Sequence, residues 1–172
     1  MSTVIDELKK GGIPDFIYRI AKDEGIDPKV LVDYIINGHV VVCRNNLHQG
    51  FDPIAIGKDT RIKVNANIGT SPTLCDFEEE IDKVKVAVSS GADTVMDLSI
   101  AGDISGFRKK ITGECNITLG TVPIYEAMIG LEQPEDLTIE HFLEVVEKQA
   151  KEGVDFMTIH SGVRKQHIPF VD

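Results

Sequence analysis

Four segments of this chain share one pattern, in which a short predicted β-strand ends on a polar, aromatic or sulfur-containing side chain. They cover residues 64–70, 94–98, 120–125 and 155–160. The side chains Asn67, Met96, Tyr125 and His160 are 29, 29 and 35 residues apart, about the length of one strand, one loop and one helix. A β/α barrel builds its site in this way, from the carboxyl ends of many strands. We therefore predict an α/β fold that is the first half of a (β/α)8 TIM-type barrel, because the sequence contains about four such units and a closed barrel has eight.

The sequence divides into two regions near residue 60. Residues 1–60 predict a small helical accessory region, with helices that begin near Pro14 and at Asp27–Pro28 and a short strand over residues 40–43. Residues 61–172 alternate between strand and helix patterns, which implies parallel strands joined by right-handed crossovers. We predict about four β/α units in this region, ending before a barrel would close.

Capping residues and apolar periodicity locate the elements of the second region. A strand that includes residues 62–64 precedes a helix that Asp76 and Glu79 cap and Gly91 ends. Further strands are predicted over residues 93–98, 117–124 and 155–159, and a further helix over residues 103–112. The last helix begins after Thr138, with an inward face made of Phe142, Leu143, Val146 and Ala150.

The composition argues against several classes of function. Acidic residues outnumber basic ones by 28 to 18, for a formal net charge of −10, whereas nucleic-acid binders usually present a basic face. No apolar run approaches the ~18 residues of a membrane span, and the first residues lack a secretory leader. The three cysteines, Cys43, Cys75 and Cys115, are too far apart to indicate a metal-binding pair or a disulfide framework. We expect a cytoplasmic protein that binds neither nucleic acid nor a membrane.

The first candidate site residues lie at the ends of two strands. Asn65 and Asn67 alternate on one strand and so point to one face, where their amides either recognise a polar ring or ribose or simply stabilise the turn. Met96 either packs on a planar ligand or belongs to the core. Its neighbour Asp97 is either a strand-end acceptor or the cap of the next turn.

Two further candidates follow the later strands. Tyr125 either extends its hydroxyl into a pocket or lies on the rim, and His160 either contacts a substrate or is satisfied by backbone carbonyls. The other histidines show no HxH or HxxxH spacing, so we predict no self-contained metal site. Asp103 stands at a loop-to-helix junction, which favours an N-cap over a catalytic acid.

Together these segments resemble the ThiC family, the 4-amino-5-hydroxymethyl-2-methylpyrimidine phosphate synthases of thiamine biosynthesis. The resemblance extends over nearly the whole chain. It is carried by residues 53–58 (PIAIGK), 65–71 (NANIGTS), 91–99 (GADTVMDLS), 120–125 (GTVPIY) and 153–160 (GVDFMTIH).

The resemblance implies a radical S-adenosylmethionine (SAM) lyase that converts 5-aminoimidazole ribotide to the pyrimidine phosphate. In the family, SAM and a 4Fe-4S cluster generate a 5′-deoxyadenosyl radical, and a divalent metal, zinc, is also bound. The substrate contacts implied here are an amide from Asn67, packing by Met96, and hydrogen bonds from Tyr125 and His160. The implied partners are the small-molecule ribotide and either a second copy of the chain or a complementing C-terminal fragment.

This sequence also departs from the family. Family members are more than twice as long, and their metal-binding histidines and cysteine triad correspond to positions beyond Asp172. We therefore expect an N-terminal portion that is inactive alone. Two alternatives remain open: a 5-hydroxybenzimidazole synthase of anaerobic cobamide synthesis, and a non-enzymatic half-barrel that binds a ligand. Smaller departures at residues 45–48, 100–102 and 161 are compatible with a paralogue of altered substrate handling.

Overall fold

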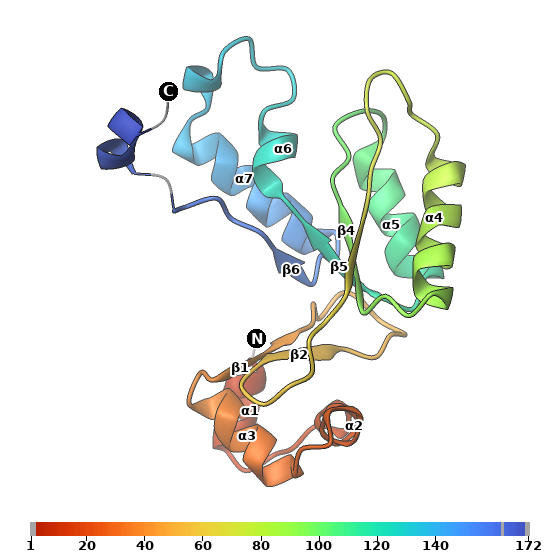
Figure 1. Cartoon of the computed structure of the whole chain (residues 1–172), viewed down its shortest axis with the longest axis vertical. Helices are drawn as coiled ribbons and strands as arrows, with labels where there is room; N and C mark the ends of the chain where they lie inside the picture. Colours follow the sequence, from red (N-terminus) through yellow and green to blue (C-terminus); the bar gives the residue numbers. More distant parts are fainter. Residues whose placement is uncertain (1–2, 163, 171–172) are drawn as a thin grey trace.

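Three short helices and a hairpin form the N-terminal region (Figure 1) of a computed structural model that describes residues 3–162 and 164–170. The helices are α1 (Val4–Lys9), α2 (Asp15–Glu24) and α3 (Pro28–Ile36), and the antiparallel strands are β1 (Val40–Cys43) and β2 (Ile54–Gly57). Asp27 accepts hydrogen bonds from the first N–H groups of α3, and Gly25 ends α2 with a φ of 66°. The apolar sides of the helices meet Val40 and Ala55 of the hairpin in one buried cluster.

The second region alternates strands and helices around a parallel sheet. Its strands are β3 (Asn65–Ile68), β4 (Thr94–Asp97), β5 (Thr118–Thr121) and β6 (Phe156–Met157), which lie side by side in chain order. Its helices are α4 (Phe77–Ser89), α5 (Ile104–Glu114), α6 (Pro123–Ala127) and α7 (Ile139–Lys151), with 3-10 turns η1 (Pro134–Asp136) and η2 (Lys165–Phe170). The predicted parallel α/β architecture is confirmed, whereas the described strands form an open sheet and no closed barrel.

The two faces of this sheet differ. On one face, Ile68, Val95 and Leu119 pack with α4 and α5 in a buried cluster that includes Ile81 and Ile111. On the other face, the register aligns one row of residues across the strands, which consists of Asn67, Met96, Gly120 and Phe156. In the described part of the chain no helix packs on this second face, so its side chains are available to a ligand or to further chain.

Buried polar contacts connect the two regions. Glu24 at the end of α2 accepts from the Lys63 ammonium at 2.8 Å and from the Arg61 backbone N–H at 2.8 Å, just before β3. His48 Nδ1 lies 2.7 Å from Asp155 Oδ2, and both side chains are fully buried. Asp155 also accepts from the Leu119 N–H at 2.8 Å, so one carboxylate links the accessory region to β5 and β6. The division near residue 60 stays a prediction about domains.

Several predicted boundaries are wrong. The strand predicted over residues 117–124 ends at Thr121, because Pro123 opens α6 as its first residue, where a missing N–H costs nothing. Tyr125 therefore lies on a helix and not at a strand end. The strand predicted over residues 155–159 is limited to Phe156–Met157, and residues 62–64 precede β3. Strand β2 was not predicted.

The inward face predicted for the last helix is also wrong in part. Thr138 caps α7 as expected, but the buried residues are Val145 and Gln149, while Leu143 is 57% exposed. Apolar residues occur on two sides of this helix, and the polar partner that Gln149 finds in Thr121 Oγ1, at 2.7 Å, decides which side turns inward.

Gly120 is required by the ring of Phe156. A Cβ atom added at Gly120 would lie 2.3 Å from Phe156 Cζ, so a side chain here displaces the ring from the sheet. We expect Gly120→Ala to lower the free energy of unfolding by about 1–3 kcal/mol, as overpacking usually does. Urea unfolding followed by circular dichroism measures this loss.

Gly113→Ala is the matched control. Gly113 lies in α5, where an added Cβ meets nothing within 4 Å, so alanine should raise stability by about 0.5–1 kcal/mol. Equal effects of the two substitutions would contradict the Phe156 contact.

Candidate functional site

Asn67 and Met96 are direct neighbours on the open face of the sheet. They are paired in the β3–β4 register, and both lie in the row that ends on Phe156. Met96 is half-buried and Asn67 is exposed. An open groove of about 500 Å³ lies beside Met96 and Phe156, towards the first residues of β3 and β4; Asn67 is not among the residues that line it, which are Ile56, Gly57, Thr60, Arg61, Ile62, Lys63, Asn65, Thr94, Met96 and Phe156. An amide and a thioether are thus available side by side to a ligand on this face.

A hydrogen-bond relay orients the Asn67 amide. The Thr94 hydroxyl donates to Asn65 Oδ1 at 2.7 Å, and Asn65 Nδ2 donates to Asn67 Oδ1 at 2.8 Å. Asn65 is therefore hydrogen-bonded to two strand residues and not to the backbone of the following turn. The relay uses the acceptor of Asn67 and leaves its Nδ2 group as the donor that a ligand can meet.

Tyr125 and His160 form a second pair. Their ring centroids are 6.2 Å apart with an interplanar angle of 30°, although one residue lies on α6 and the other follows β6. Tyr125 is 41% exposed and lines an apolar hollow of about 580 Å³ with Leu98, Ile100 and Met128. Among the described residues no hydrogen bond or ring contact joins this pair to Asn67 or Met96. Both pairs nevertheless belong to the carboxyl-terminal side of the sheet, where β/α proteins place their sites.

The loops after β3 and β4 lie unusually close together. Gly69 has a φ of +147°, and an added Cβ would lie 2.7 Å from the backbone of Leu98 and Ser99, so only glycine permits this approach. Its N–H donates to the buried carboxylate of Glu80 at 2.8 Å. The Thr70 N–H donates to Ser99 Oγ at 3.1 Å, and the two strand ends are thereby fixed to each other.

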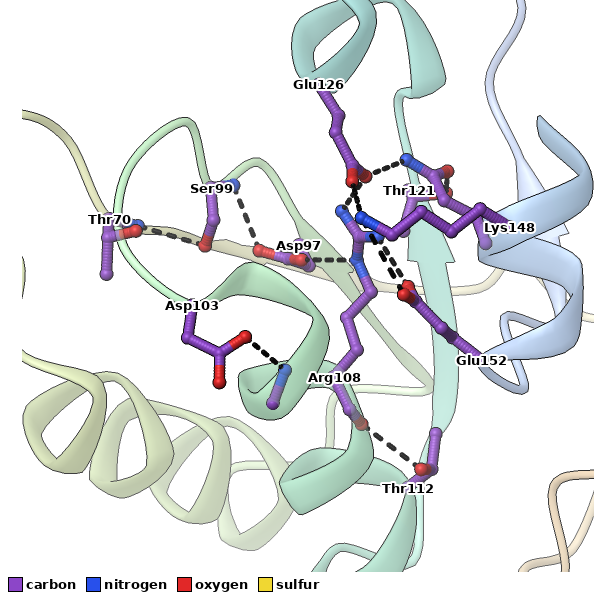
Figure 2. Close-up of polar contacts among 12 residues, drawn as sticks. Thr70, Asp97, Ser99, Asp103, Arg108, Thr112, Thr121, Glu126, Lys148 and Glu152 are labelled. Carbon is purple, nitrogen blue, oxygen red and sulfur yellow. Dashed lines mark hydrogen bonds and ion pairs between the residues drawn. The ribbon is translucent and has the colours of Figure 1, made fainter. Parts of the chain in front are cut away.

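A buried arginine lies under these strand ends (Figure 2). Arg108 of α5 is 1% exposed. Its guanidinium contacts Asp97 at 2.9 Å, Glu126 at 2.7 Å and Glu152 at 2.8 Å, so it joins β4, α6 and the end of α7. Glu126 also accepts from Lys148 at 2.5 Å and from Gln149 at 2.7 Å. One cation thus connects most of the second region.

The charges of this cluster stabilise each other. Burial alone would lower the pKa of Arg108, but Asp97 and Glu126 raise it above its ordinary value, so the guanidinium stays charged. Burial would likewise raise the pKa of Glu126, but hydrogen bonds from Lys148 and Gln149 and the charge of Arg108 bring it below its ordinary value of 4.5. Arg108 and Glu126 are therefore both ionised at neutral pH.

Two acidic candidates have defined places in this arrangement. Asp97 both accepts from the Ser99 N–H at 2.9 Å and pairs with Arg108, so it is an acceptor and a turn residue at once. Asp103 accepts from the Gly106 N–H at 3.0 Å, which confirms that it is the N-cap of α5.

Sequence reasoning missed Arg108, Glu126 and Gln149. A usable signal existed, because Arg108 falls among Ile104, Phe107 and Ile111 in the inward stripe of its helix. A charge at such a position must find an opposite charge in the core. Glu80 and Gln149 interrupt the inward faces of α4 and α7 in the same way.

The described residues provide no grouped ligands for an iron–sulfur cluster or a metal ion. Over residues 3–162 and 164–170 no three His, Cys, Asp or Glu side chains are grouped so that they could bind a metal ion. Cys43 and Cys115 are buried and Cys75 is exposed. The described chain also has no helix that combines the length and apolarity needed to cross a bilayer.

These observations define a parallel α/β protein that presents an amide and a thioether on two of its strands and a phenol and an imidazole beyond two others. The sequence model of the radical SAM ThiC family matches residues 3–172, and the chain belongs to this family.

Proteins named phosphomethylpyrimidine synthase are similar to this chain. That of Halobacterium salinarum is 44% identical over 172 residues, which is 100% of this chain and 36% of the relative. That of Pyrococcus furiosus is 45% identical over 168 residues, 95% of this chain and 39% of the relative. That of Thermodesulfovibrio yellowstonii is 42% identical over 168 residues, again with 39% of the relative covered. The chain thus spans little more than a third of the length of these curated relatives.

The environments of the cysteines predict their reactivity. Burial, with the Asp155 charge in addition, raises the pKa of Cys43 to about 11, and burial also raises the pKa of Cys115. The thiolate is the reactive form, so both should react slowly with Ellman's reagent at pH 8, whereas exposed Cys75 should react fast. We expect one fast thiol in the folded protein, none in Cys75→Ser, and three after denaturation of the original chain. Fast reaction of a second thiol in the folded state would contradict this assignment.

Loss of Arg108 should be costly and pH-dependent. Arg108→Met leaves buried carboxylates without their cation, and we expect about 3–5 kcal/mol less stability at pH 7. Because the pKa of Glu126 is depressed in the folded state, its contribution is complete above pH 4.5 and is lost as the pH falls through the folded pKa. The difference in free energy of unfolding between Arg108→Met and the original chain, measured with urea, should therefore become smaller towards pH 4.

Lys109→Met is the control for this variant. Lys109 is the exposed neighbour of Arg108 on α5, and its loss should change stability by no more than about 0.5 kcal/mol. If the loss of stability in Arg108→Met stays constant between pH 7 and pH 4, lost packing and not lost charge causes it.

Proposed function

We propose that this chain is the N-terminal, substrate-binding part of a radical SAM synthase that converts 5-aminoimidazole ribotide to 4-amino-5-hydroxymethyl-2-methylpyrimidine phosphate in thiamine biosynthesis. The observation that carries the proposal is the pairing of Asn67 with Met96 and of Tyr125 with His160, on the side of the sheet where β/α enzymes bind substrates. The match of residues 3–172 to the ThiC family supports it.

Each of the four side chains has a role in the proposed site. Asn67 offers its Nδ2 donor to an acceptor of the ribotide, because its Oδ1 is already used by Asn65. Met96 provides a polarisable surface for the planar imidazole ring. Tyr125 and His160 stack on each other, and each adds a hydrogen-bonding group at its edge. The proposed site therefore binds one flat ring and several polar groups.

The proposal includes the larger architecture. Residues 61–172 supply the first four or so β/α units of a barrel, and residues 1–60 form an accessory region attached through Glu24 and His48. Further units of the longer protein cover the open face of the sheet.

The radical chemistry requires groups that these residues do not hold. SAM and a 4Fe-4S cluster supply the radical in the family, and zinc is a further metal. The buried cysteines and the lack of any grouped ligands among the described residues do not fit a cluster or a zinc ion here. We therefore expect the purified 172-residue chain to show no turnover with ribotide, SAM and a reductant. Product formation under these conditions would refute this part of the proposal.

Binding of the ribotide tests the site directly. In calorimetric titrations we expect the chain to bind 5-aminoimidazole ribotide, and His160→Ala to weaken binding about tenfold through the loss of one hydrogen bond. His39→Ala is the matched control, since His39 is also exposed and also lies against a tyrosine ring, Tyr34, at 6.1 Å. Equal losses in both variants, or no binding by the original chain, would refute the site.

The product can be identified in a chimera. The matching segment of the Pyrococcus furiosus synthase, 45% identical over 168 residues, is replaced by this chain, and products are analysed by mass spectrometry. We expect the pyrimidine phosphate. Formation of 5-hydroxybenzimidazole would show that the alternative synthase is correct, and a folded chimera that yields neither product would favour a non-enzymatic binding module.

A further inference from the structure

Helix α6 carries a proposed substrate contact and a buried ion pair on adjacent residues. The Tyr125 ring lies against the His160 ring. Its neighbour Glu126 turns into the cluster around Arg108 (Figure 2). The helix has only five residues, and a helix this short does not hold its place by backbone hydrogen bonds alone. Its position is therefore set by tertiary contacts.

The strongest of those contacts run through Glu126. Its carboxylate meets Arg108 at 2.7 Å, Lys148 at 2.5 Å and Gln149 at 2.7 Å. Among the described residues, the other side-chain hydrogen bond to α6 runs from His141 Nε2 to the Ala127 carbonyl at 3.1 Å. Charged hydrogen bonds in a buried site are stronger and more directional than a neutral contact of this kind.

The same guanidinium reaches the other proposed contacts. Asp97, which pairs with Arg108, directly follows Met96 in β4. Asp97 in turn accepts from the Ser99 N–H, and Ser99 Oγ accepts from the Thr70 N–H, three residues after Asn67 (Figure 2). Arg108 is thus linked, through partners that are near neighbours in sequence, to Met96, Tyr125 and Asn67. It contacts none of these three side chains itself.

We infer that Arg108 is a positioning residue for the ribotide site, acting through Glu126 to place Tyr125 against His160. The inference rests on the proposed function for its ligand, but the placement of the two rings does not depend on any ligand. A guanidinium suits this task because it is planar and presents its donors in a fixed fork, so that the directions of Asp97, Glu126 and Glu152 are set together.

Glu152 provides a matched control within the same cluster. It contacts the same guanidinium at 2.8 Å and is similarly buried, but it lies at the C-terminal end of α7. Strand β6, which separates Glu152 from His160, is fixed independently by its pairing with β5 and by the Asp155 contacts. Glu126→Gln and Glu152→Gln therefore remove the same charge from the same cation at different distances from the site.

The experiment compares these variants by NMR in the full 172-residue chain. The ring signals of His160 report the nearby Tyr125 ring, and Tyr125→Leu gives their positions when that ring is absent. We expect both glutamine variants to lose a similar amount of thermal stability. Only Glu126→Gln should move the His160 signals towards the Tyr125→Leu positions, and only it should weaken binding of 5-aminoimidazole ribotide, by about tenfold.

Each outcome decides the inference. Equal shifts of the His160 signals in both variants, or no shift in Glu126→Gln, would overturn the positioning role. If Glu126→Gln does not fold, Arg108→Lys replaces it, because it keeps the buried charge but removes the planar fork that orients Glu126, and an unchanged His160 signal would then overturn the role. If the original chain does not bind the ribotide, the proposed function fails, and the His160 signals alone decide whether Arg108 places Tyr125.

Discussion

The burial of one guanidinium constrains the whole second region of this protein. Removal of a cation from water costs several kcal/mol, and Arg108 recovers this cost only if its carboxylate partners from β4, α6 and α7 are all in place. The four elements must therefore assemble in one relative arrangement. An apolar residue at this position would permit the same burial with looser geometry. The arginine thus specifies an arrangement of elements in addition to any stability that it contributes.

This constraint matters because the rest of the region is held by short strands. The longest described strand of the parallel sheet has four residues, and β6 has two. Short strands fix register but leave their following segments free, and the proposed site is built from the ends of β3 and β4, from α6 and from the segment after β6. Arg108 and its carboxylate partners lie directly beneath these segments. They fix the positions of the segments, which the short strands do not. The close approach at Gly69 has the same effect for the loops after β3 and β4.

Local sequence predicted the parts of the fold that local chemistry decides. The caps at Asp27, Asp76 and Asp103 and the strand–helix alternation were all readable, because each depends on neighbouring residues. The helix that begins at Pro123 was not, because an apolar segment that contains one proline fits a strand or a helix start equally well. The inward side of α7 was missed because a distant partner, Thr121, decides it.

The candidate site likewise has one part that local sequence predicts and one part that distant contacts decide. Equal spacing along the chain brings Asn67 and Met96 into register, and the sequence suffices to expect their proximity. The contact of Tyr125 with His160 depends on α6, and α6 depends on Arg108. No pattern in residues 120–125 contains that information. The candidate side chains could be named from the sequence, but the contact between Tyr125 and His160 could not be expected from it.

The relay on the open face has a consequence for how ligand preference can change. The Thr94 hydroxyl on β4 is linked through the Asn65 amide to the amide that Asn67 presents on the open face. If valine replaced Thr94, Asn65 Oδ1 would lose its hydrogen-bond donor. The side-chain amides of Asn65 and Asn67 could then rotate together, with no change in the shape of the sheet surface. The hydrogen-bonding character of Asn67 would then change while Asn67 itself stayed the same. A substitution at a buried position of β4 can therefore alter what Asn67 offers to a ligand.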